Sequence, residues 1–131
     1  MANISNLHTA VDYRDVDAVR SLSTEHVGME DKDEVGATPL ISAAGSDQFI
    51  IAEVLIDNGA DIWAYDRFGI TAGRMADVSV TPDDSEEGAA RARVMAKMAD
   101  RGFPFPAPDR ATVLQMVKEK NWPPKSSTKA K

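Results

Sequence analysis

The side chains best suited to chemistry in this chain of 131 residues are two histidines. His8 and His26 are far apart in the sequence, and no serine lies in a nucleophile pattern such as Gly-x-Ser-x-Gly. The chain has no cysteine, which excludes disulfides, thiolate nucleophiles and zinc–thiolate sites. We therefore expect no catalytic residue.

An acidic cluster is the one candidate for metal binding. Asp83, Asp84, Glu86 and Glu87 offer the oxygen ligands that Ca²⁺ prefers, but they lack the spacing of an EF-hand loop. Glycine-rich phosphate-binding patterns are also missing. We expect a solvated loop, no metal site and no cofactor. The enzymatic alternative requires a cleft that contains carboxylates with shifted pKa values, and no pattern in the sequence indicates one.

Charge is divided unevenly along the chain. The 15 basic and 21 acidic residues give a net charge of −6, which argues against a nucleic-acid partner. Residues 1–66 carry a net −10 and residues 67–131 a net +4. The acidic half favours a partner with a basic patch. No apolar run approaches the roughly 20 residues of a membrane span, and the start lacks a signal-peptide pattern, so we expect a cytoplasmic, monomeric protein that does not bind membranes.

These residues belong to a chain that repeats itself every 33 positions. A fixed period of this length indicates a stack of similar helical units. The matching pairs include Asp33 with Asp66, Gly36 with Gly69, Thr38 with Thr71, Leu7 with Leu40, and Leu22 with Leu55.

Local signals place two helices in the central unit. Thr38 is a good N-cap and Pro39 suits the first helical position, while Ser5 takes the Thr38 position one unit earlier. Apolar spacings of three and four predict a second helix over residues 49–57. Gly36 and Gly59 suit turns that require a positive φ.

The segment from Asp33 to Tyr65 resembles an ankyrin repeat. It has the opening D-x-x-G-x-T-P-L, an Ala-Ala pair and the closing N-G-A-D. The resemblance implies an all-α solenoid of about three helix-turn-helix repeats. The expected boundaries are repeats at about 1–32, 33–65 and 66–108, an insertion near 79–88, a capping helix over 109–122 that forms half a fourth repeat, and a disordered basic tail over 123–131.

The third repeat departs from this pattern. Gly73 stands where Leu40 stands one repeat earlier, and Asp77 stands where Ala44 does. The repeat is therefore degenerate, and the polar insertion lies between its two helices. Beyond it, Asp109 is a suitable cap for the last helix.

The family resemblance also implies the function, a non-enzymatic protein–protein interaction through the turn tips and the concave helix face. Aromatic and arginine side chains are favoured at such interfaces. The alternative is a dedicated regulator, inhibitor or assembly chaperone of one enzyme or complex. Carried over by position, the expected protein-binding residues are Asp12, Tyr13, Glu34, Val35, Trp63, Tyr65, Arg67 and Phe68.

Two of the singled-out residues have structural alternatives. Trp63 either binds the partner or braces neighbouring turns by packing against Tyr65 or Phe68. His8 occupies a position that the family uses structurally, so we expect it to hold the fold together. His26 takes the place of the turn glycine at Gly59 and is expected to be exposed.

Overall fold

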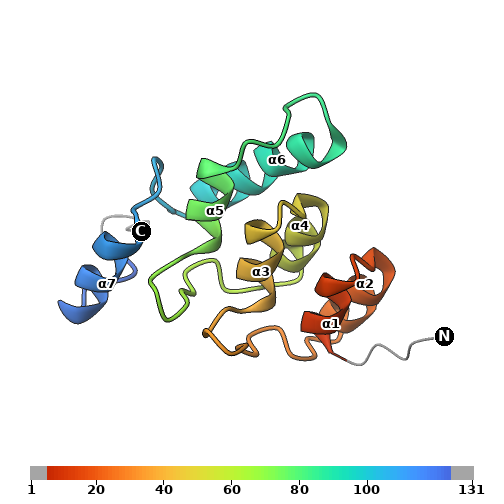
Figure 1. Cartoon of the computed structure of the whole chain (residues 1–131), viewed down its shortest axis with the longest axis horizontal. Coiled ribbons are helices and arrows are strands. Elements are labelled where there is room, and N and C mark those ends of the chain that lie inside the picture. Colours follow the sequence, from red (N-terminus) through yellow and green to blue (C-terminus); the bar gives the residue numbers. More distant parts are fainter. Residues whose placement is uncertain (1–5, 125–131) are drawn as a thin grey trace.

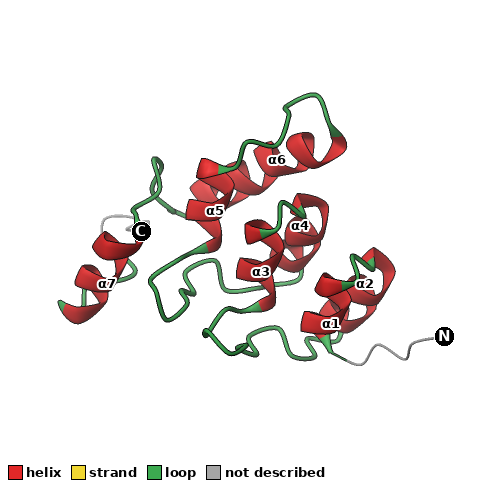
Figure 2. Cartoon of the chain, viewed as in Figure 1, coloured by secondary structure: helices red, strands yellow, loops and turns green. Residues whose placement is uncertain are grey.

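The structure is a computed structural model that describes residues 6–124, and within this range it contains seven helices and no strand. Six helices stand in three neighbouring pairs, and the seventh lies at the end opposite the N-terminus (Figure 1). Long loops join one pair to the next along one side of the molecule (Figure 2). Between residues 6 and 124, no helix is long and apolar enough to cross a membrane. The helices are α1 (Leu7–Asp12), α2 (Val16–Thr24), α3 (Pro39–Gly45), α4 (Phe49–Asp57), α5 (Ala72–Val78), α6 (Glu86–Asp100) and α7 (Arg110–Lys118).

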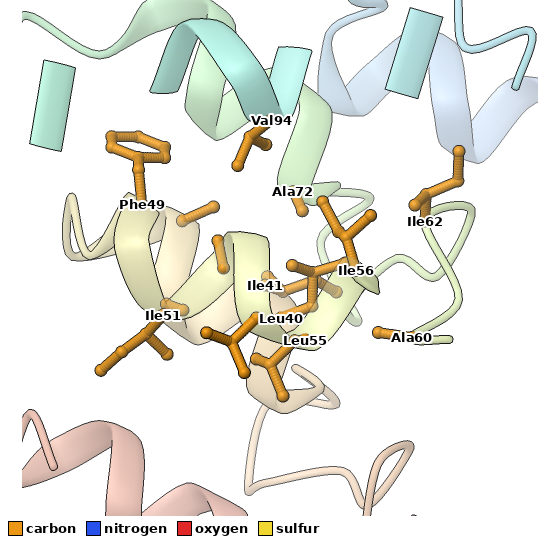
Figure 3. Packing of buried hydrophobic residues seen from close by; sticks show 14 of the residues in the cluster. Leu40, Ile41, Phe49, Ile51, Leu55, Ile56, Ala60, Ile62, Ala72 and Val94 are labelled. Atoms are coloured by element: carbon orange, nitrogen blue, oxygen red, sulfur yellow. The ribbon is translucent and has the colours of Figure 1, made fainter. Parts of the chain in front are cut away.

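The core is centred on α4, which packs against α2, α3 and α6. The apolar spacing predicted this helix with its observed bounds. Phe49, Leu55 and Ile56 are fully buried, and Leu40 of α3 and Val94 of α6 complete the same cluster (Figure 3). Each large buried side chain contributes about 1.5–3 kcal/mol relative to an exposed one. The stack is therefore held together by aliphatic packing between neighbouring pairs.

The first helices of the three pairs begin with equivalent caps. Thr38 Oγ1 accepts the Ile41 N–H at 3.4 Å, and Thr71 caps α5 in the same way. In the first pair the cap is Asn6, whose Oδ1 accepts the Thr9 N–H at 2.8 Å. The sequence predicted the cap one residue earlier, at Ser5, which lies outside the described residues.

The second helix of the central pair, α4, takes its cap from a neighbouring helix. Gln48 precedes α4 but provides no capping hydrogen bond from its side chain. Glu87 of α6 takes this role, because its Oε1 accepts the Ile50 N–H at 2.9 Å. Glu87 therefore belongs to a helix and caps another, whereas the sequence placed it in a solvated loop.

The loop at the predicted insertion is shorter than expected. Ser85 caps α6, so residues 86–88 are helical and the irregular stretch between the two helices covers residues 79–85. Arg91 fixes the preceding helix, since its guanidinium donates hydrogen bonds to the carbonyl oxygens of Ala76 and Asp77 at the end of α5. The inserted residues thus lengthen α6 and leave a short loop.

Residues 103–107, Phe-Pro-Phe-Pro-Ala, form a segment that we call the strap. The Phe103 ring occupies the space beside Gly73, where a Cβ would overlap the ring. Asp77 Oδ2 accepts the Ala107 N–H at 2.7 Å, and Arg74 donates to the Ala107 carbonyl at 3.2 Å. The two departures of the third repeat from the repeat pattern, Gly73 and Asp77, are therefore the residues that receive the strap.

The last helix ends earlier and lies elsewhere than predicted. Asp109 caps it as expected, through the Thr112 N–H at 2.9 Å, but α7 stops at Lys118 instead of continuing to residue 122. Lys120 adopts a left-handed backbone with φ of 62°. A helix cannot continue through this conformation, so the chain turns back. In place of half a fourth repeat on α5 and α6, α7 lies against the turn at Gly69 (Figure 1).

Ion pairs link α4 to α6 at the surface. Arg93 lies 3.0 Å from Glu53, and Lys97 bridges Glu53 at 3.2 Å and Asp57 at 2.6 Å. The hydrogen bond from Arg93 lowers the pKa of Glu53 despite the opposing effect of burial. Water screens exposed pairs of this kind, so they only supplement the apolar packing.

The space that Leu40 fills in the second repeat is filled by the ring of Phe103 beside Gly73 in the third, and this difference leads to a testable prediction. In the wild-type chain, Gly73→Leu should destabilise the fold by about 1–3 kcal/mol, because the new side chain overpacks against Phe103. Phe103→Ala alone should cost about 3 kcal/mol through the cavity it leaves. In that background Gly73→Leu should be stabilising, since leucine fills the cavity and is the better helix former. Urea unfolding of the wild type, the two single variants and the double variant measures the free energy of unfolding of each. The prediction is contradicted if Gly73→Leu changes this free energy in the same direction with Phe103 and with alanine at position 103.

Candidate protein-binding surface

Two turns of identical construction lead into α3 and α5. Asp33 Oδ1 accepts the backbone N–H groups two and four residues later, at 3.0 and 2.9 Å. Asp66 Oδ1 does the same one repeat later, at 2.9 and 3.0 Å. Gly36 and Gly69 have φ of 85° and 86°, a conformation that only glycine adopts without strain. The period of 33 thus reproduces a hydrogen-bonded turn.

The two turns are joined to each other through the backbone. The Arg67 N–H donates to the Val35 carbonyl at 2.8 Å. Val35 is half-buried, whereas Glu34, Arg67 and Phe68 have exposed side chains. Phe68 is 41% exposed, and the Arg67 guanidinium lies 5.3 Å from the centroid of its ring. A cation held over an aromatic face limits the freedom of both side chains. The tip of the second turn therefore presents an ordered apolar ring, that of Phe68, beside the positive charge of Arg67.

A groove of about 470 Å³ lies beside this tip, between α5 and the start of α7. Gly69 backs onto α7, where a Cβ would overlap the Arg110 carbonyl and approach Leu114. Leu114 is 40% exposed. The tip and α7 therefore form the two sides of one apolar surface. The residues that line the groove are Ile70, Arg74, Met75, Val78, Asp109, Arg110 and Ala111.

Exposed apolar side chains also stand at the ends of the first helices. Asp12 ends α1, and Tyr13, its C-cap, is 64% exposed. Val78 ends α5 at the position equivalent to Asp12 two repeats later and is 48% exposed. Isolated exposed apolar residues are common, but Val78 lines the groove, where a cluster of exposed apolar side chains is typical of an interaction surface.

Trp63 lies in an internal aromatic cluster with residues of the strap and the C-terminal end. Its ring stacks on Phe103 with centroids 5.1 Å apart, and Trp122 meets it edge-on at 5.5 Å. Phe105 packs against Phe103 at 5.3 Å. The structure therefore shows Trp63 bracing the fold, but against the strap and not against Tyr65 or Phe68 as the sequence suggested. A role of Trp63 in binding stays a prediction.

Tyr65 lies next to this cluster. It is half-buried and forms an isolated β-bridge with Thr71, which closes the second turn. Its position between the turn and the aromatic cluster separates it from Phe68, which is exposed at the tip. The two aromatic residues that the sequence grouped together thus belong to different surfaces.

The surface carries both signs of charge. The groove has two arginines, Arg74 and Arg110, and one carboxylate, Asp109, whose pKa is lowered by the hydrogen bond from the Thr112 N–H. The acidic residues of the first two repeats lie further along the stack. Those with exposed positions include Asp12, Asp17, Glu25, Glu30, Asp31, Asp33, Glu34, Asp57 and Asp61.

The two histidines differ in their surroundings. His8 Nε2 lies 2.8 Å from the Asp31 carbonyl oxygen and ties α1 to the following loop, which is the structural role predicted for it. His26 is exposed, as predicted, and has a positive φ of 58°, the conformation of the glycine it replaces.

The sequence did not single out Met75 or Leu114. Met75 belongs to α5, where an apolar side chain is equally suited to a core. It lines the groove because α7 turns away after the strap, which leaves one side of α5 uncovered. The only available signal was the glycine at position 73, which shows that the third repeat packs differently.

The helical pairs define an all-α solenoid, and comparison with known families assigns its class. The ankyrin-repeat family model matches residues 35–67, the segment that contains α3 and α4. The chain therefore contains an ankyrin repeat at these residues. No curated protein matches it. The repeat boundaries outside the matched segment remain predictions.

The turn aspartates offer a second testable prediction. Asp66 is 6% exposed and Asp33 is exposed, although both accept two backbone hydrogen bonds. Asp66→Ala should cost about 3 kcal/mol, because it leaves two N–H groups without partners in a buried site, and Asp33→Ala about 1 kcal/mol, because water replaces the carboxylate. Denaturant unfolding measures both, with Asp84→Ala, in the exposed loop, as the neutral control. Equal losses at the two turns would contradict the argument from burial.

Proposed function

We propose that this protein is a non-enzymatic binding module whose partner protein docks on the turn tips and the concave helix face. The observation that carries the proposal is the set of exposed apolar side chains Phe68, Val78 and Leu114 at the groove, with a further one, Tyr13, at the end of α1. Buried aromatic and arginine anchors supply most of the affinity of such interfaces. Phe68 and Arg67 are already ordered by their mutual contact, which reduces the entropy lost on binding.

The charge distribution supports a partner with a basic patch. The first half of the chain carries a net charge of −10, and its carboxylates are largely exposed. A field of this kind accelerates encounter with a positively charged partner and is screened at high salt. Asp12 and Glu34 contribute to the field beside Tyr13 and the first turn. They are proposed to steer the partner, and the apolar residues to retain it.

Capture from an extract of the source cells tests the proposal. The immobilised wild-type chain should retain a partner, and Phe68→Ser or Tyr13→Ser should reduce the retained amount by about ten-fold or more, the effect of losing an aromatic anchor. Val27→Ser is the matched control, because Val27 is 41% exposed, as Phe68 is, but follows α2 and does not line the groove. Quantitative mass spectrometry gives the amounts.

The pattern of captured proteins separates two forms of the proposal. Several weakly retained partners favour a general interaction module. One partner retained in equal amount with the chain favours a dedicated regulator, inhibitor or assembly chaperone. If the two variants retain as much as the wild type, the surface is not the binding site.

A further inference from the structure

A second pocket, separate from the groove, opens between the loops that lead into α3 and α5. Its volume is about 360 Å³, within the range of small-ligand sites. Three aromatic side chains, Trp63, Tyr65 and Trp122, share its lining with two carboxylates, Glu30 and Asp61. Aromatic faces and carboxylates share one property, an attraction for positive charge.

The aromatic part of the pocket is held in place from behind. Phe103 stacks on Trp63, and the Trp122 indole N–H donates to the Trp63 carbonyl at 2.8 Å. Both tryptophans are half-buried, so part of each side chain remains available at the pocket. A ligand would therefore meet rings that are already ordered, which lowers the cost of binding.

The two carboxylates are oriented by backbone hydrogen bonds. Glu30 Oε2 accepts the Asp61 N–H at 2.9 Å, and Asp61 Oδ1 accepts the Trp63 N–H at 2.8 Å. The second oxygen of each carboxylate has no protein partner within residues 6–124. Burial raises the pKa of Glu30, the nearby charge of Asp61 raises it further, and the Asp61 N–H lowers it. Two carboxylates are thus oriented close together at an exposed site.

The balance of charge at the pocket is negative. Lys32 also lines it, so the two carboxylates exceed the one ammonium group by one charge. The surrounding half of the chain is acidic as well. An anionic ligand would meet repulsion here, whereas a cation with an apolar stem would satisfy both the carboxylates and the rings.

We propose that this pocket binds a lysine or arginine side chain of the partner protein. This inference rests on the proposed function and gives its partner a chemistry: a basic residue whose methylene stem lies along Trp63, Tyr65 and Trp122 while its charged end reaches Glu30 and Asp61. The pocket would then fix the register of a partner that also contacts the tip at Phe68.

Titration of the full-length protein with a small probe tests the pocket directly. The probe is the acetylated and amidated peptide Gly-Gly-Lys-Gly-Gly, and its counterpart carries norleucine in place of lysine. The chain has two tryptophans, so two indole N–H signals in the ¹⁵N NMR spectrum report on the pocket. The lysine peptide should shift both signals saturably, and the norleucine peptide should bind at least about five-fold more weakly, since it lacks the charge.

Charge-neutralising variants give the decisive comparison. Glu30→Gln together with Asp61→Asn should weaken lysine-peptide binding by about ten-fold, because each amide keeps the oxygen that accepts the backbone N–H but loses its charge. Asp84→Asn is the matched control, since Asp84 is exposed outside the pocket. Equal binding of the two peptides, or binding unaffected by the double variant, would overturn the proposal.

The chain's own basic tail is an alternative occupant that the same titration distinguishes. Replacement of Lys125, Lys129 and Lys131 by glutamine should leave lysine-peptide affinity unchanged. Tighter binding would assign the pocket to the tail and overturn its assignment to a partner. Failure of the peptide to bind, with capture still lost in Phe68→Ser, would refute the pocket alone. If Phe68→Ser still captures the partner as the wild type does, the proposed binding surface is refuted, whatever the peptide does.

Discussion

The packing of Phe103 against Gly73 is the contact on which the C-terminal third of the structure depends. An ankyrin repeat places a larger aliphatic residue at this position of its first helix, as Leu40 does in the second repeat. With glycine there, α5 has a hollow beside its axis, and the ring of Phe103 fills it. Dense packing leaves room for one of the two side chains, so glycine at 73 and phenylalanine at 103 require each other.

This contact determines where the chain goes next. Asp77 and Arg74 hold Ala107, so the strap crosses α5 in place of a fourth helical pair. Two surfaces result from this path. The groove exists because α7 stands away from α5, and the second pocket exists because Trp122 returns to Trp63. The chain that follows the strap therefore supplies part of both candidate binding sites.

The turns use one set of residues for stability and leave another set available for recognition. Asp33 and Asp66 satisfy the backbone of each turn, so its shape does not depend on the side chains at the tip. Glu34, Arg67 and Phe68 are consequently free to serve a partner. This arrangement explains why a common scaffold carries different specificities, since the scaffold uses one set of residues and the binding surface another.

The sequence by itself determined what is local and periodic. The repeat of 33 residues, the caps at Thr38 and Asp109 and the bounds of α4 follow from hydrogen-bonding and spacing rules that operate within a few residues. The exposed position of Phe68 follows from the same register. Tertiary structure decided the surroundings of Trp63 and both cavities, because these depend on contacts between residues about 30 to 60 positions apart, such as Asp77 with Ala107 and Trp63 with Trp122. No local pattern encodes such contacts, since they arise only when the strap meets α5 in the folded chain.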